Sequence, residues 1–257
     1  MAKPYPYFVS LSEAISLCQS THPIMESEEI PIAEGINRVI SGDVKARVND
    51  PPFDNSSMDG FAVIHSDTTS PPTELSIIGS IMAGSPQIHR LLPGQAVRIM
   101  TGAPIPEGAD SIIPIEDCTV DGDKVTLNQP SKPHFIRKLG ENFSIDQTIF
   151  SPGATMSPEK IALCAAAGVS TIPVYQKLKI AVISTGDELK PLTDDLGYGQ
   201  IYESNSYGLA ALVEIYGHEA TRFPNVIDDL DILRDTLVEA SKTHDCIITS
   251  GGVLSLI

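Results

Sequence analysis

The chain is short of basic residues. Its 257 residues include 17 lysines and arginines against 33 aspartates and glutamates, which gives a formal net charge of −16. A surface of that sign repels nucleic acid and acidic membrane lipids, so we expect neither as a partner. A phosphorylated ligand has to be held locally, by backbone amides, helix N-termini, a few basic side chains or a divalent cation on carboxylates.

Several groupings that mark common kinds of site are also missing. The cysteines Cys18, Cys118, Cys164 and Cys246 show no CxxC spacing, and we expect reduced core residues rather than metal ligands or nucleophiles. The histidines form no HxxxH or HxH pair, which argues against a zinc site, and no GxSxG elbow occurs. No apolar run approaches the roughly 18 residues of a membrane span, and the first residues lack a signal peptide's apolar stretch. The expected location is the cytoplasm.

The apolar pattern predicts two kinds of region before residue 177. Ser10 and Glu13 form a capping box at the start of a short amphipathic helix, and Pro158 follows Ser157 at the start of another helix. Between them, short β-type runs separated by proline and glycine extend from about residue 48 to 137, with a hairpin turn at 121–123. We predict a discontinuous helical domain, residues 1–47 plus 141–176, interrupted by an inserted β domain, residues 48–140.

After residue 177 the pattern becomes strand, helix, strand, helix, strand. The expected ranges are 180–184, 205–216, 220–223, 229–241 and 246–249. Units of this kind build a parallel sheet with helices on its faces, and ligands bind beyond the carboxyl ends of the strands. We therefore predict a partial three-layer α/β domain over residues 177–257, and a multidomain fold of α+β and α/β class.

A polar or glycine-rich cluster follows each of these three strands, so we expect all three on one rim. Thr185-Gly186-Asp187-Glu188 supplies adjacent carboxylates that suit Mg²⁺, or that stabilise a helix N-terminus. Asp228-Asp229 has the sequence of a helix cap. Ser250-Gly251-Gly252 lets backbone amides approach a phosphate, or forms a plain strand-to-helix turn. A nucleotide-binding Rossmann enzyme fits the pattern but lacks its GxGxxG fingerprint.

Four phrases, in this order, resemble the molybdopterin molybdenumtransferase family, which includes bacterial MoeA and the E domain of gephyrin. They are Asp54-Asn55-Ser56-Ser57-Met58-Asp59-Gly60, the stretch from Met100-Thr101-Gly102-Ala103-Pro104 to Asp110, Ser184-Thr185-Gly186-Asp187-Glu188-Leu189, and Ser250-Gly251-Gly252. The resemblance covers nearly the whole chain, from the helix near residue 10 to Val253.

The resemblance implies molybdenum cofactor biosynthesis: molybdenum passes from molybdate into adenylylated molybdopterin, AMP is released, and Mg²⁺ assists. The implied catalytic residues are Asp59, Thr101, Glu188 and Asp228, and the implied metal ligands are Glu188 and Asp187. The implied ligand-binding residues are Ser184, Thr185, Gly186, Asp187, Ser250, Gly251, Gly252 and Arg137. The family also implies a homodimer, in which Asp59 and Thr101 of one subunit complete the Glu188 rim of the other, and the molybdopterin adenylyltransferase as a partner.

The sequence departs from the family pattern in two places. Asn142 stands where the family has an acid, which leaves the role of this position open. After Val253 the family continues with a serine, lysine-bearing segments and a C-terminal β domain, whereas this sequence reads Leu254-Ser255-Leu256-Ile257. We therefore expect a truncated, frame-shifted or partial chain with little transfer activity and an aggregation-prone sheet edge. The alternative is an inactive family member that serves as a binding or scaffold protein.

Overall fold

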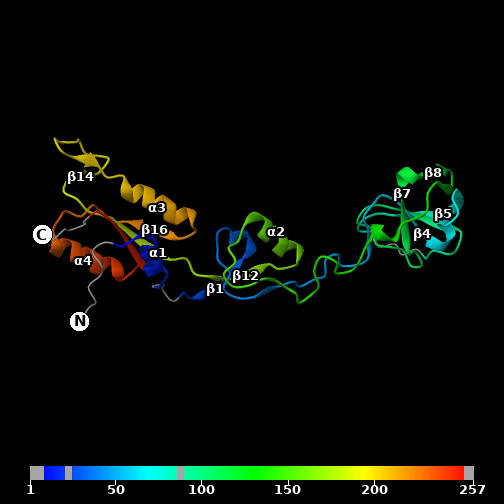
Figure 1. Ribbon diagram of the computed structural model, residues 1–257, viewed down its shortest axis with the longest axis horizontal. Coiled ribbons are helices and arrows are strands. Elements are labelled where there is room, and N and C mark those ends of the chain that lie inside the picture. The colour runs from blue at the N-terminus through cyan, green and yellow to red at the C-terminus, as the bar shows by residue number, and fades with distance from the viewer. Residues whose placement is uncertain (1–8, 21–24, 86–89, 252–257) are drawn as a thin grey trace. The chain divides into compact units, whose positions relative to one another are not determined.

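The computed structural model describes residues 9–20, 25–85 and 90–251 as a mixed α/β protein (Figure 1). Internal contacts divide the chain into two compact units. The first comprises residues 1–43, 151–161 and 171–257, and the second comprises 44–150 and 162–170. Within the described ranges, no helix is long and apolar enough to cross a membrane. The three-domain division proposed from the sequence stays a prediction.

Helix α1 (Leu11–Ser20) opens the first unit with the predicted capping box. The Ser10 amide donates to Glu13 Oε2 at 2.8 Å, and the Glu13 amide donates back to Ser10 Oγ at 3.3 Å. The apolar stripe of this helix is not buried, since Leu11 is 79% exposed.

An antiparallel ladder follows in the same unit. Strand β1 (Ser27–Pro31) pairs with β12 (Thr171–Tyr175), and Ile30 lies opposite Ile172 in a buried position. The 3-10 turn η1 (Ile32–Glu34) follows β1, and helix α2 (Pro158–Ala166) spans the division between the two units at residues 161 and 162. Helix α2 begins at the proline that the sequence placed in its first turn.

The parallel sheet of the first unit has the predicted βαβαβ order. Strand β13 (Lys179–Ser184) lies between β16 (Glu219–Arg222) and β17 (Cys246–Ser250), all parallel. Ile180 and Val182 pack with α3 (Asn205–Ile215), whereas Ala181 and Ile183 pack with α4 (Leu230–Ser241). The two helices therefore cover opposite faces (Figure 1). Between β13 and α3, the short strands β14 (Leu189–Lys190) and β15 (Ile201–Tyr202) pair in parallel.

The second unit is built on a six-stranded sheet of order β7-β4-β6-β5-β9-β8. Its strands are β4 (Gly60–Val63), β5 (Thr73–Ile81), β6 (Gln95–Ile99), β7 (Ser111–Pro114), β8 (Cys118–Asp121) and β9 (Lys124–Leu127). The smaller elements are β2 (Val44–Lys45) paired with β11 (Thr148–Phe150), β3 (Asn55–Ser56) paired with β10 (Ile136–Arg137), and the 3-10 turns η2 (His65–Thr68), η3 (Ile115–Asp117) and η4 (Pro133–Phe135). The predicted hairpin turn is confirmed, because β8 and β9 pair antiparallel around Gly122 at a φ of 60°.

The cysteine prediction holds in part. All four cysteines are free, and Cys164 is buried. Burial raises the pKa of the half-buried Cys118 thiol to about 12, with the charges of Asp117 and Glu116 adding to it, so this thiol is unreactive at neutral pH. The expectation of core positions is wrong for Cys18 and Cys246, which are exposed. Cys18 lies on α1, none of whose residues is buried, and Cys246 begins the outer strand β17.

Candidate functional site

The carboxyl ends of the parallel strands are tied together by backbone hydrogen bonds. The Thr185 amide, directly after β13, donates to the Ser250 carbonyl at the end of β17 at 2.9 Å. The next amide, that of Gly186, donates to the Val226 carbonyl beyond β16 at 3.0 Å. Ends of neighbouring parallel strands meet at one edge, so the clusters after the three strands share a rim in the first unit.

The rim gathers exposed carboxylates. Asp187 Oδ1 accepts a hydrogen bond from the Asp228 amide at 3.1 Å, which joins the clusters after β13 and β16. The Glu188 carboxylate folds back over Gly186, where an added Cβ would lie 2.6 Å from Glu188 Oε2. The capping interpretation holds for Asp229, whose Oδ1 accepts from the first-turn amides of α4 at 2.9 and 3.0 Å. The Asp228 side chain is exposed beside it.

Gly251 allows the close approach of β17 to the neighbouring loop. Its φ is 91°, and a Cβ at this position would lie 2.3 Å from the Thr185 carbonyl oxygen. Glycine is therefore required by packing at the rim, whatever its role toward a ligand. Gly252 lies outside the described residues.

Two buried polar atoms at the rim lack a hydrogen-bond partner within the described part of the chain, Thr185 Oγ1 and Asn225 Oδ1. The other amide atom of Asn225, Nδ2, donates to the Gly186 carbonyl at 3.0 Å. Buried polar groups are nearly always satisfied in folded proteins by protein, water or ligand. The two unpartnered oxygen atoms are therefore consistent with a rim that binds a polar ligand.

A metal ion at the rim would need ligands beyond the protein side chains, such as waters and substrate phosphates. Across residues 9–20, 25–85 and 90–251, no group of three or more His, Cys, Asp or Glu side chains could hold a metal. Mg²⁺ retains several waters and uses only one or two carboxylates together with substrate phosphates. Asp187 and Glu188 match that kind of donor set.

The lysine and arginine side chains that follow Lys190 in the described chain are all in ion pairs. Beyond Lys190, the described chain contains three lysines and arginines, each in an ion pair with a carboxylate: Arg222 with Glu203, Arg234 with Asp231 and Asp235, and Lys242 with Glu239. Lys190, two residues after Glu188, belongs to none of these ion pairs, so an anionic ligand at the rim has Lys190 available besides backbone amides and an added cation.

The second unit brings together Asp59 and Thr101, the predicted residues of its first two motifs. Asp59 precedes β4 and Thr101 follows β6, and the antiparallel pairing of Gly60 with Ile99 places these ends side by side. Asp59 Oδ1 accepts from the Thr101 amide at 2.7 Å and from its hydroxyl at 2.8 Å. The hydrogen bond from the Thr101 amide lowers the pKa of Asp59 most, and the hydrogen bond from the Thr101 hydroxyl and the charge of Arg98 lower it further. It is a carboxylate at neutral pH.

Arg137 lies near the same loops. It is exposed on β10, opposite Asn55 of the first motif, and Asn55 in turn bridges to Pro104 of the second motif. Asp54 is held by Lys138 Nζ at 2.7 Å and by the Leu139 amide at 2.8 Å, and these contacts lower its pKa.

Asn142 has a partner that explains the amide at this position. Its Nδ2 donates to Asp50 Oδ2 at 2.8 Å. An ionised acid at position 142 would face a second carboxylate there, which is unfavourable.

A polar network at the rim includes Glu203 and Asn205, which the sequence analysis did not select. Glu203 is buried and accepts from the Ser184 hydroxyl at 2.8 Å, and Asn205 Nδ2 donates to Ser250 Oγ at 2.7 Å. The available signal was an acidic residue two positions before the apolar helix α3 and an amide residue at its first position. Such residues are common at helix starts, and this pattern alone does not separate a cap from a site.

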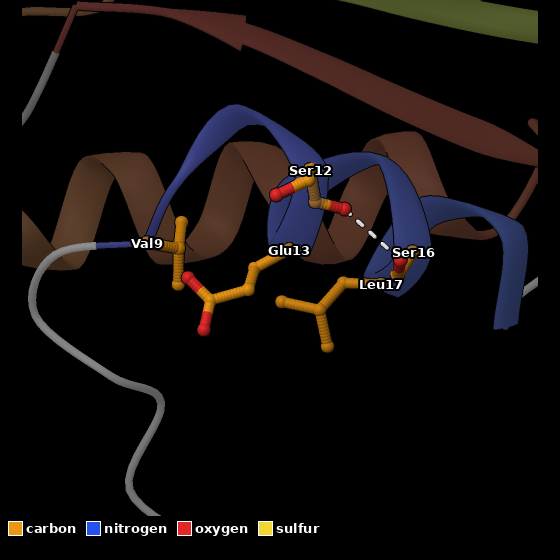
Figure 2. Close-up of a pocket in the computed structure, with 5 residues that line it drawn as sticks. All are labelled: Val9, Ser12, Glu13, Ser16 and Leu17. Atoms are coloured by element: carbon orange, nitrogen blue, oxygen red, sulfur yellow. Dashed lines mark hydrogen bonds between the residues drawn. The ribbon is translucent and has the colours of Figure 1, made fainter.

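A groove of about 410 Å³ lies along α1 in the first unit, lined by Val9, Ser12, Glu13, Ser16 and Leu17. Figure 2 shows Glu13 and Leu17 projecting from the same side of the helix, with Ser16 Oγ bonded to the Ser12 carbonyl. The one carboxylate that lines the groove, that of Glu13, belongs to the capping box, and none of the predicted site residues lines the groove. This groove along α1 is therefore not the candidate site, which lies at the rim of the parallel sheet.

Comparisons with known proteins match both parts of the chain. A family model described as MoeA N-terminal region (domain I and II) matches residues 9–168, and one described as probable molybdopterin binding domain matches residues 181–253. The molybdopterin molybdenumtransferase of Haemophilus influenzae is 36% identical over 230 residues, which are 89% of this chain and 57% of that protein. Molybdopterin molybdenumtransferase 2 of Mycobacterium tuberculosis is 38% identical over 229 residues, 87% of this chain and 56% of that protein.

A solved structure of the same family also resembles this chain. The molybdopterin biosynthesis moeA protein from Pyrococcus horikoshii OT3 superposes with a TM-score of 0.85 at 30% identity, over 99% of this chain and 68% of that one. The chain thus spans somewhat more than half the length of the curated relatives it matches. The first family match alone, residues 9–168, covers more than half of the sequence, and the chain therefore belongs to the MoeA family.

Proposed function

We propose that the protein acts in molybdenum cofactor biosynthesis, transferring molybdenum from molybdate into adenylylated molybdopterin with release of AMP. The names of the relatives and the molybdopterin-binding match support this assignment. The single structural observation that carries it is the rim of the parallel sheet. There the Asp187 carboxylate, the Asp228 amide and the unpartnered atoms of Thr185 and Asn225 lie together.

The proposed roles are positional and electrostatic. We assign ligand binding in the first unit to Ser184, Thr185, Gly186, Asp187, Ser250, Gly251 and Gly252, and in the second unit to Arg137. Backbone amides and hydroxyls orient the pterin and its phosphates, and Asp228 orients the molybdate end. Asp59, held ionised by Thr101, completes the catalytic set with Thr101, Glu188 and Asp228.

Magnesium belongs to the same proposal. Asp187 and Glu188 would hold the ion on the phosphates, where it neutralises charge on the substrate. The ion pairs of Arg222, Arg234 and Lys242 support this, because they leave the compensation of substrate charge to backbone amides, Lys190 and an added cation.

We further propose a cytoplasmic homodimer and an encounter with the molybdopterin adenylyltransferase, which makes the adenylylated substrate. The dimer can be tested by light scattering at micromolar concentration. A monomeric mass would contradict this part of the proposal.

Cofactor formation from adenylylated molybdopterin and molybdate tests the assignment. Whereas the sequence pattern predicts little transfer activity, the family assignment predicts that the wild-type chain releases AMP in a Mg²⁺-dependent manner and that Glu188→Gln lowers the rate at least about tenfold. The ion pairs of Arg222, Arg234 and Lys242 also favour a second candidate, a protein that binds molybdopterin without transferring metal. Molybdopterin binding without AMP release supports the second candidate, and absence of both contradicts the assignment.

A further inference from the structure

Three residues around the start of α3, Glu203, Asn205 and Ser206, contact the ends of all three parallel strands. Glu203 Oε1 accepts from the Ser184 hydroxyl, the last residue of β13, at 2.8 Å. Asn205 Nδ2 donates to Ser250 Oγ, the last residue of β17, at 2.7 Å. Ser206 Oγ accepts from Nε of Arg222, the last residue of β16, at 2.8 Å. We call residues 203–206 the strand-end clasp.

Glu203 is the centre of the clasp because its carboxylate is buried and fully occupied. Only 8% of its side chain is exposed. Besides the Ser184 hydroxyl it accepts from the Ser206 amide at 2.7 Å and the Ser206 hydroxyl at 2.5 Å, and Arg222 lies 3.7 Å away. Removing one member of such a network leaves the other buried groups unsatisfied.

Arg222 is fixed from a second side. Its guanidinium stacks 3.2 Å from the centre of the Tyr207 ring, in addition to its contacts with Ser206 and Glu203. A planar guanidinium suits stacking and directed hydrogen bonds at once. The end of β16 is thereby held against the first turn of α3.

The clasp acts on the residues that face the rim. Ser184 directly precedes the loop 185–188, and Ser250 O accepts the Thr185 amide. A shift of either serine therefore moves the Thr185 and Asp187 backbone, on which the contact with the Asp228 amide depends.

We infer that Glu203 is a positioning residue, which with Asn205 holds the loops 185–188 and 250–251 in the arrangement that receives the ligand. The inference rests on the proposed function for the identity of that ligand. Glu203 does not contact the ligand in this account, and acts through Ser184 and the start of α3.

Amide hydrogen exchange tests the positioning directly and without any ligand. In Glu203→Gln, which keeps the side-chain volume, the amides of Thr185, Gly186 and Asp228 are expected to exchange at least about tenfold faster. The amides of Ala181 and Val182 in the middle of β13 are expected to stay within about twofold. Glu214→Gln, near the other end of α3, is the matched control and should leave all five amides unchanged.

Two results would overturn the inference. One is wild-type exchange at Thr185, Gly186 and Asp228 in folded Glu203→Gln. The other is equal acceleration along the whole of β13, which would show a purely structural role. Should Glu203→Gln fail to fold, the exposed Asn205→Ala variant decides: it should speed exchange at Thr185 and spare Ala181, and a wild-type rate at Thr185 contradicts the inference.

Binding of AMP with Mg²⁺, measured by calorimetry, links the clasp to the ligand. Glu203→Gln is expected to raise the Kd at least about tenfold while Glu214→Gln leaves it unchanged. If the wild-type chain binds neither AMP nor molybdopterin, the proposed function fails while the exchange result still stands for the clasp. If it binds AMP and Glu203→Gln binds equally well, the clasp has no role in ligand binding and this inference fails alone.

Discussion

The two candidate regions are organised in opposite ways. In the first unit, the buried carboxylate of Glu203 accepts a hydrogen bond from Ser184, which directly precedes the loop with the exposed Asp187 and Glu188. In the second unit, Asp59 is held by direct bonds from Thr101, and both residues are exposed. Buried networks couple site geometry to stability, whereas exposed contacts contribute little to it. Substitutions in the buried network around Glu203 should therefore change folding and binding together, and those at Asp59 should change binding alone.

The largest effect is expected where backbone packing leaves no room. A Cβ on Gly60 would lie 2.0 Å from the Ile113 carbonyl oxygen, so Gly60→Ala should destabilise the second unit by about 3 kcal/mol. The matched control is Gly208→Ala in α3, where nothing lies within 4 Å and alanine should stabilise by about 0.5–1 kcal/mol. Urea unfolding followed by circular dichroism measures both. A Gly60→Ala midpoint equal to wild type would show that the β4–β7 packing is looser than described.

Loss of the buried carboxylate comes next. Glu203→Ala leaves the Ser184 hydroxyl and the Ser206 amide and hydroxyl without their acceptor and Arg222 without its carboxylate partner, and should destabilise the first unit by about 2–3 kcal/mol. Denaturant unfolding with a probe in the first unit checks this. A change below about 0.5 kcal/mol, the usual range for surface positions, would contradict the buried network.

The same residue predicts a pH dependence of known sign. Burial opposes ionisation of Glu203, but the bonds from Ser206 and Ser184 and the charge of Arg222 outweigh it and lower its pKa below the usual 4.5. An acid with a lowered folded-state pKa stabilises the fold above its unfolded pKa, and the contribution is lost as the pH falls through the folded value. The unfolding midpoint of the wild type should therefore drop below about pH 4.5 more steeply than that of Glu203→Gln. Parallel curves would show that Glu203 has no such shift.

Substitutions of the adjacent Asp228 and Asp229 should distinguish a helix-capping role from a role in ligand binding. Asp229→Ala removes the α4 cap and should destabilise by about 1 kcal/mol, with ligand affinity unchanged. Asp228→Ala keeps its backbone bond to Asp187, so it should change stability by less than about 0.5 kcal/mol but weaken molybdate-dependent AMP release. The two variants are compared in the same unfolding and cofactor assays. Equal behaviour of both would remove Asp228 from the proposed site.

The smallest effect on stability is expected in the second unit. Asp59→Ala and Thr101→Ala break contacts between exposed side chains, so their unfolding midpoints should match the wild type, while cofactor formation falls. The double variant should be no worse in the cofactor assay than the more affected single variant, because the two act as one pair. Fully additive losses would show independent roles.

The sequence predicted the parallel sheet well because β13, α3, β16, α4 and β17 each follow a clear local pattern. It also brought the rim clusters together, since parallel strands that share an edge leave few alternatives. It missed the strand-end clasp, because the positioning role of Glu203 depends on its contacts with Ser184 and Arg222, which lie 19 residues before and after it in the sequence. It misplaced Cys18 and Cys246 because apolar neighbours in sequence do not ensure a covering layer in space. No sequence pattern distinguished Asp229 as a cap from Asp228 as its exposed neighbour.

The central claim is that the rim of the first unit holds a phosphorylated ligand through Mg²⁺ on Asp187 and Glu188. Equilibrium dialysis of AMP with and without Mg²⁺ tests it most directly, using wild type, Glu188→Gln and the control Glu239→Gln on α4. We predict that Mg²⁺ tightens binding to wild type and to Glu239→Gln by at least about tenfold, and tightens binding to Glu188→Gln by less than about twofold. Equal Mg²⁺ dependence in all three proteins would contradict the account.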